Sequence, residues 1–415
     1  MKTIQLLLLT LMAAALPARA DIEVRLSVKF ILNAGGAAPT NSSDIDLSTS
    51  TAFDAEITHG NATLAATGRG YRLRVVEYLN IQPPSPAAAT VSITGGITSG
   101  SATVTCSNTA GLQTWMRVLG AGVPANTVVL GINPNTSFTI SNNALYTAPS
   151  EWYSGSFPAD HWYQVPARSA REYIEAAALA AQTTWRWNPS AINIYVNNSR
   201  SGSCSFVGNG LSIAMGSTIF TRGTVNHEIG HFFNLSHTHN GDPVFAGWVA
   251  PTPLSSGLSN GDGLTETLPD HPFYNIDQLS VGNFGGNYAA LTAGQRPAVD
   301  DTFYNVMSYH LEDRFLDIQM DHWAWNANIH RKFACSGYTV FVAPFGSNPS
   351  GAPLDGGLNA NAPLATMDAA LFYTARRTSP DDVVLLRSGN YMAPATQMTT
   401  PCTLRAERGP VTLTR

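Results

Sequence analysis

Residues 227–237, His-Glu-Ile-Gly-His-Phe-Phe-Asn-Leu-Ser-His, contain three of the ten histidines in this 415-residue chain. His227 and His231 are four residues apart, so a helix of about 3.6 residues per turn places both imidazoles on one face. Two neutral imidazoles one turn apart can bind a single zinc ion from the same side. Glu228 then lies beside the ion rather than on it, where a carboxylate suits the role of general base.

His237 follows His231 by six residues, so it reaches the same ion only if the helix ends between them. Such an ending commonly uses a left-handed residue, for which glycine is the least strained choice and asparagine the next. Asn234 stands where this turn is needed, and Thr224 or Asn226 is expected to cap the start of the helix. Three protein ligands leave one position for water, as in catalytic rather than structural zinc sites.

The pattern His-Glu-x-x-His-x-x-Asn-x-x-His resembles the signature of the metzincin zinc endopeptidases, with Asn234 in place of the family glycine. These enzymes also carry a methionine turn, and residues 305–309, Asn-Val-Met-Ser-Tyr, resemble it. The resemblance implies an α+β, zincin-like protease domain with a twisted mixed sheet, an active-site helix and a C-terminal helix. It implies that Met307 forms a hydrophobic floor beneath the metal and that Tyr309 approaches the zinc or the oxyanion.

Residues 261–269 and Thr238 narrow the resemblance to the pappalysin-like, cytophagalysin-type branch, and the likeness covers residues 150–333. Glu266 departs from this branch, which often has aspartate at that position. Residues 240–300 are rich in Gly, Asn, Asp and Pro, and we expect a long irregular stretch there. Asp262, Asp270 or backbone carbonyls are candidate calcium ligands, and an ordinary solvated loop is the alternative.

The composition favours an exported, loop-rich and β-rich protein. The chain is 44% hydrophobic and 12% charged, enough for a large core in two or three domains. Its net charge of −5 becomes −7 without residues 1–20, and the absence of a basic run argues against nucleic-acid binding. The expected partner is a protein or peptide substrate, and no run after residue 20 is apolar enough to span a membrane.

Residues 1–20 are typical of a signal peptide. Lys2 supplies the positive start, residues 6–16 the apolar centre, and Ala18-Arg19-Ala20 a small-x-small cleavage site. The alternative is a membrane anchor, but the apolar run is shorter than the ~20 residues that span a bilayer. We therefore expect secretion, to the extracellular space or the periplasm, after cleavage near Ala20. Export permits disulfides among the four cysteines, and Cys335 with Cys402 is the favoured pair.

The hydrophobic pattern divides the rest of the chain into four parts. Residues 21–89 begin the protease domain, and residues 90–148 form an inserted all-β module. Residues 149–334 form the catalytic domain, and residues 335–415 form a β-rich module that resembles the first coil of a parallel β-helix. The predicted strands are 22–32, 71–81, 102–106, 127–132, 137–140, 191–196 and 211–214, and the predicted helices are 52–68, 168–187 and 315–332. The family resemblance implies that residues 211–214 lie at the sheet edge, beside the substrate.

The residues and the resemblance together predict a secreted zinc-dependent endopeptidase that hydrolyses peptide bonds by a Glu-assisted water. His227, His231 and His237 are the expected metal ligands, and Glu228 and Tyr309 are the expected catalytic residues. An adhesin or glycan-binding surface protein on a degenerate protease scaffold is the alternative. The intact set of ligands and glutamate argues for the enzyme, because a degenerate site usually loses one of them.

Overall fold

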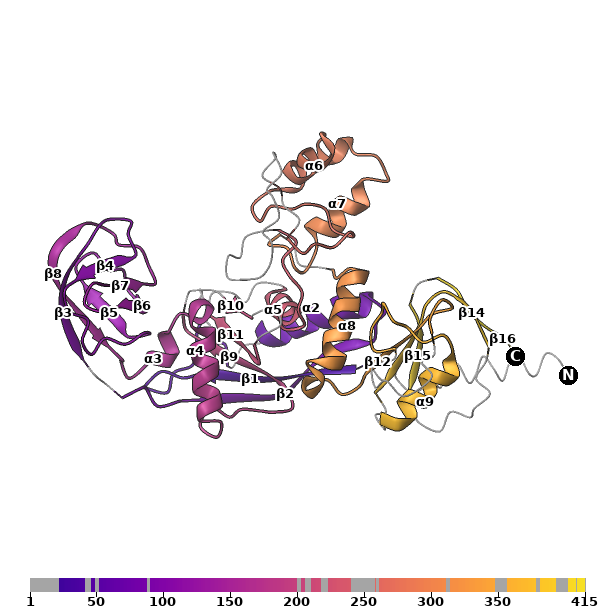
Figure 1. The fold of residues 1–415 in the computed structure, drawn as a ribbon, viewed down its shortest axis with the longest axis horizontal. Coiled ribbons are helices and arrows are strands. Elements are labelled where there is room, and N and C mark those ends of the chain that lie inside the picture. The colour runs from indigo at the N-terminus through magenta and orange to yellow at the C-terminus, as the bar shows by residue number, and fades with distance from the viewer. Residues whose placement is uncertain are drawn as a thin grey trace. The chain divides into compact units, whose positions relative to one another are not determined.

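The computed structural model describes residues 22–41, 46–48, 52–87, 90–199, 203–205, 210–217, 223–239, 258, 261–310, 314–347, 357–377, 381–392, 402–407 and 409–414. The expected signal peptide lies outside these residues. Helices and several separate sheets are mixed along the chain, which places it in the α+β class (Figure 1). In the described part of the chain, no helix combines the length and the apolar character needed to cross a bilayer.

The chain divides into two compact units. An amino-terminal unit comprises Leu26–His59 and Val75–Ser236. A carboxy-terminal unit comprises the described residues within Met1–Arg25, Gly60–Arg74 and His237–Arg415.

A five-stranded sheet has the order β10-β11-β9-β1-β2. Strand β1 pairs in parallel with β9, and β9 with β11, whereas β10 is antiparallel to β11. Strand β1 alternates apolar and polar residues from Ile22 to Lys29, yet nearly all of its residues are buried. The predicted position of residues 211–214 at the edge is wrong, because β10 pairs outside β11. The strands are β1 (Ile22–Ile31), β2 (Tyr71–Ile81), β9 (Ile192–Asn197), β10 (Ser203–Cys204) and β11 (Ser212–Gly216).

Helix α4 (Ala167–Ala180) packs against β11 in the amino-terminal unit. It ends before the predicted residue 187, and Arg186 adopts a left-handed conformation in the turns that follow. Ile174 of α4 packs in one apolar cluster with Trp185 from these turns and with Tyr195 of β9. Helix α2 (Ala52–Ala66) forms where residues 52–68 predict a helix.

Lys29 is an ionisable side chain buried in β1. Its ammonium donates to Ser27 Oγ and to Asn193 Oδ1. Burial lowers the pKa of Lys29 to about 7, although the Glu77 carboxylate opposes this effect. The lysine therefore loses its proton more readily in the folded protein than in the unfolded chain.

We expect this burial to make the free energy of unfolding rise with pH between about 7 and the ordinary lysine value of 10.5. In that pH range Lys29 is protonated in the unfolded chain and largely deprotonated in the folded protein. It therefore raises the free energy of unfolding by up to ~1.4 kcal/mol per pH unit. Lys29→Met should remove this contribution. Urea unfolding of both proteins at several pH values from 7 to 10 measures it, and an unchanged slope in the variant would contradict the assignment.

A second sheet of six strands has the order β5-β8-β3-β4-β7-β6, and all its ladders are antiparallel (Figure 1). It encloses an apolar core of its own that includes Val104, Phe138 and Tyr153. The sheet continues to Ser156, beyond residue 148, where the inserted module was expected to end. Its strands are β3 (Val91–Ile97), β4 (Thr103–Cys106), β5 (Arg117–Gly120), β6 (Val129–Asn133), β7 (Ser137–Ile140) and β8 (Ala148–Ser156).

Two helices in the carboxy-terminal unit correct the expectation of an irregular stretch over residues 240–300. They are α6 (Ile276–Phe284) and α7 (Arg296–Phe303), and residues 240–257 lie outside the described part. Asn275 begins α6 with a capping box, and Gly285 ends it in the left-handed conformation. The two helices contribute Leu279 and Val299 to one small apolar cluster, which is why this segment folds. The predicted closing helix forms as α8 (Asp317–Ile329).

The last part of the carboxy-terminal unit contains parallel strands. β12 (Thr339–Val342), β13 (Val383–Leu386) and β15 (Thr403–Ala406) form one sheet, and β14 (Gly389–Met392) pairs with β16 (Val411–Thr414). Helix α9 (Met367–Arg377) precedes β13. All three ladders are parallel.

The predicted disulfide between Cys335 and Cys402 is wrong for this structure, in which both are free cysteines. Cys335 lies four residues before β12, and Cys402 immediately precedes β15. Cys335 instead lies in an isolated antiparallel bridge with Val24.

Candidate metal centre

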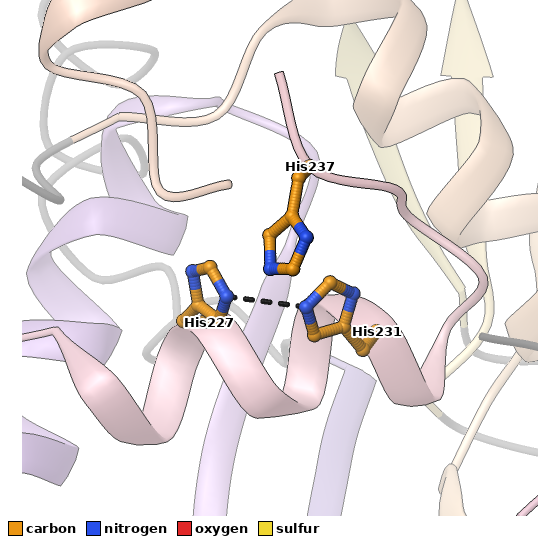
Figure 2. A group of neighbouring side chains, drawn as sticks. All are labelled: His227, His231 and His237. Atoms are coloured by element: carbon orange, nitrogen blue, oxygen red, sulfur yellow. Dashed lines mark hydrogen bonds between the residues drawn. The ribbon is translucent and has the colours of Figure 1, made fainter. Parts of the chain in front are cut away.

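Helix α5 (Thr224–Phe232) presents His227 and His231 one turn apart, and the segment that follows it returns His237 to the same place (Figure 2). The Nε2 atoms of His227 and His231 are 3.1 Å apart. One ligand nitrogen from each of the three imidazoles lies within 4.8 Å of the others, and all three side chains are buried. Residues 223–239 are described without interruption, so one continuous segment supplies the whole group.

The turn that returns the chain depends on Asn234, whose φ of 70° confirms the predicted left-handed conformation. Leu235 N donates to Gly230 O at 3.0 Å, and Asn234 N donates to His231 O at 2.9 Å. These two hydrogen bonds define a Schellman motif with Asn234 as its left-handed residue. The motif ends the helix and directs the chain back toward the face that carries the first two histidines.

We expect Asn234→Gly to change the free energy of unfolding little and Asn234→Ala to lower it by about 1 kcal/mol. Alanine carries a Cβ that strains the left-handed conformation, and it lacks the polar side chain that makes asparagine tolerable there. Denaturant unfolding of the three proteins tests this order. An alanine variant as stable as the wild type would contradict the role of the turn.

The hydrogen bond of His231 fixes which nitrogen is available to a metal. Its Nδ1 lies 2.7 Å from Leu235 O, and a carbonyl oxygen only accepts, so Nδ1 carries the proton. In the neutral imidazole, Nε2 is then unprotonated, so its lone pair is available to a metal, and it faces Nε2 of His227. Two imidazole nitrogens on a tetrahedral zinc at 2.0–2.1 Å are about 3.3 Å apart, close to the 3.1 Å seen here.

The donor atoms fit a transition metal better than calcium, because imidazole nitrogen suits ions such as zinc whereas calcium takes oxygen ligands. Among the described residues, this is the one group of at least three His, Cys, Asp or Glu side chains close enough to share an ion. Within that part of the chain, Asp262 and Asp270 do not belong to any such group, so the structure does not support the predicted calcium site.

The candidate calcium ligands instead have protein partners. Asp262 Oδ1 accepts from Leu264 N and Thr267 Oγ1, and burial raises the pKa of Asp262 to about 6. Asp270 is fully buried and accepts from Thr238 Oγ1 at 2.7 Å and from His310 Nε2 at 3.1 Å. Asp270 thus anchors the residue that follows the third histidine.

The methionine turn is connected to the same segment within the carboxy-terminal unit. Thr238 N donates to Met307 O at 3.1 Å, and Asn305 Oδ1 accepts from Met307 N at 2.8 Å. Met307 itself is fully buried. The Tyr309 ring contacts the His237 ring edge-to-face at 4.8 Å, and Tyr309 is 43% exposed. The structure therefore brings both predicted residues into the surroundings of the third histidine.

The start of α5 differs from the prediction, because neither Thr224 nor Asn226 is its N-cap. The N-cap is Gly223, which has no side chain and a left-handed φ of 101°. Glu56 from α2 substitutes for a capping side chain: its Oε2 accepts from Gly223 N at 3.1 Å and from Val225 N at 3.2 Å. Burial raises the pKa of Glu56 to about 7, and the backbone donors oppose this rise. No local sequence signal marks Glu56, since its partners are far along the chain.

Comparison with protein-family models, with curated proteins and with solved structures found no match to this chain. The three histidines, Glu228 and their surroundings are therefore the basis for a function.

Proposed function

We propose that this chain is a zinc-dependent endopeptidase of the metzincin type, in its pappalysin-like branch, with His227, His231 and His237 as the metal ligands. The observation that carries the proposal is the buried triad, with two facing Nε2 atoms 3.1 Å apart and the Nδ1 proton of His231 engaged by Leu235 O. Three imidazole ligands leave one position open, as catalytic zinc sites do. When bound, zinc lowers the pKa of water to about 7 and polarises a carbonyl.

Glu228 has the role of proton carrier in this proposal. It follows His227 directly on α5, it is buried, and it is not one of the three clustered ligands. Its carboxylate accepts a proton as water attacks the peptide carbonyl and then passes that proton to the leaving amine. Hydrolysis needs both transfers because an amine leaves readily only when it is protonated.

Tyr309 and Met307 support this chemistry in different ways. The Tyr309 phenol, beside His237 and partly exposed, donates a hydrogen bond to the developing oxyanion. Met307 keeps the floor of the site apolar, and its backbone carbonyl accepts a hydrogen bond from Thr238 N. The proposal includes export, with residues 1–20 removed near Ala20.

An adhesin or glycan-binding protein on a degenerate scaffold is the second candidate, and the six-stranded sheet offers an observation in its favour. Trp152 of β8 is 71% exposed and Tyr146, in the turn before it, is 55% exposed, and exposed aromatic rings are suited to stacking on sugars. The presence of Glu228 with all three histidines favours the enzyme. Digestion of casein with and without a chelator separates the two: chelator-sensitive cleavage supports the protease, and no cleavage by zinc-loaded protein contradicts it.

A further inference from the structure

Helix α5 has only nine residues, yet it must hold two of the three metal-binding imidazoles in place. The first backbone N–H groups of a helix have no partner within it, and isolated helices this short are marginal in water. The N-cap Gly223 contributes no side chain to satisfy them. The stability of the first turn of α5 therefore depends on an acceptor from elsewhere in the amino-terminal unit.

Glu56 is that group. It is 5% exposed, and it accepts hydrogen bonds from the backbone of Gly223, Thr224 and Val225. Gly223 in turn links Glu56 to the metal ligand His227, because the carbonyl of Gly223 accepts a hydrogen bond from His227 N at 3.0 Å. Val225, the last of the three donors, is two residues before His227, or about 3 Å along the helix axis.

We infer that Glu56 is a positioning residue for the metal centre, which fixes the start of α5 so that His227 and His231 are preorganised for one ion. The inference rests on the proposed metal site and adds a residue from a separate helix to it. Because Glu56 does not contact the ion's ligands directly, it acts through the backbone of Gly223 and His227. Residues that orient metal ligands typically change affinity by about 10–100-fold when removed.

The chain contains a matched control. Glu266 accepts from Ile318 N and from Gln319 N, both at 2.8 Å, and so caps α8 from outside that helix. Helix α8 carries none of the three histidines. Glu266→Ala thus removes the same kind of cap as Glu56→Ala but should leave metal affinity unchanged.

The test is a competition titration of Zn²⁺ against a chelator, with thermal unfolding of the same samples. Both alanine variants should unfold at lower temperature than the wild type. Glu56→Ala should weaken zinc binding by about 10-fold or more, and Glu56→Gln, which keeps an accepting oxygen, should restore most of it. Zinc affinity in Glu56→Ala equal to that of the wild type, or an equal loss in Glu266→Ala, would overturn the inference.

If the alanine variant does not fold, Glu56→Asp replaces it in the test. Aspartate keeps the negative charge, but its side chain is shorter by one methylene, so the carboxylate lies farther from the backbone donors. This variant should also bind zinc more weakly, and wild-type affinity in it would overturn the inference equally. A wild-type chain that binds no zinc would instead refute the metal site itself. The two failures are therefore distinguishable.

Discussion

Glu228→Gln is expected to lower the rate of peptide hydrolysis by about 10²- to 10⁴-fold, the contribution typical of a general acid–base group. The amide has nearly the same size as the carboxylate, so the buried position on α5 remains filled. It cannot accept the proton of the attacking water, and it cannot deliver one to the leaving amine. The zinc content should not change, because Glu228 is not one of the three clustered ligands.

The measurement is kcat/KM on a fluorogenic peptide, with the zinc content of each sample measured by mass spectrometry. Glu151→Gln, an exposed residue of β8, makes the same chemical change outside the site and should keep full activity. A Glu228→Gln variant that cleaves at the wild-type rate would remove Glu228 from the mechanism.

His237→Ala is expected to weaken zinc binding by more than about 100-fold, because loss of a residue that only supports a ligand already costs about 10–100-fold. Two imidazoles from α5 remain, but the third donor from the returning segment is gone. Activity should fall with metal content, unlike in Glu228→Gln. This difference separates a ligand from a proton carrier.

Chelator competition on the wild type and the variant measures this loss. His330→Ala, which changes an exposed histidine at the end of α8, is the matched control and should bind zinc normally. Wild-type affinity in His237→Ala would show that the third ligand is a different residue.

Local signals in the sequence predicted much of the fold and of the candidate site. The spacing of His227 and His231 depends only on helix geometry, and the turn at Asn234 depends on one residue that tolerates a positive φ. The strands β1 and β2 likewise follow from the alternation of apolar and polar residues. These features needed no knowledge of distant contacts.

Features that depend on distant partners were missed. Glu56 caps a helix more than 160 residues away in the chain, and nothing near it in the sequence indicates that contact. The short helix α6 is stabilised by its capping box and by packing with Leu291 and Val299. The segment is rich in Gly and Asn, so its composition alone predicts a loop. The outer position of β10 depends on its pairing with β11, and the position of Cys335 depends on its bridge with the distant Val24.

The metal content of the wild-type protein, purified without chelators, tests the central claim most directly. Mass spectrometry should find about one zinc ion per chain, as a single site with three imidazole ligands requires. A metal-free protein that also fails to bind added Zn²⁺ would contradict the metal centre and the protease proposal that depends on it.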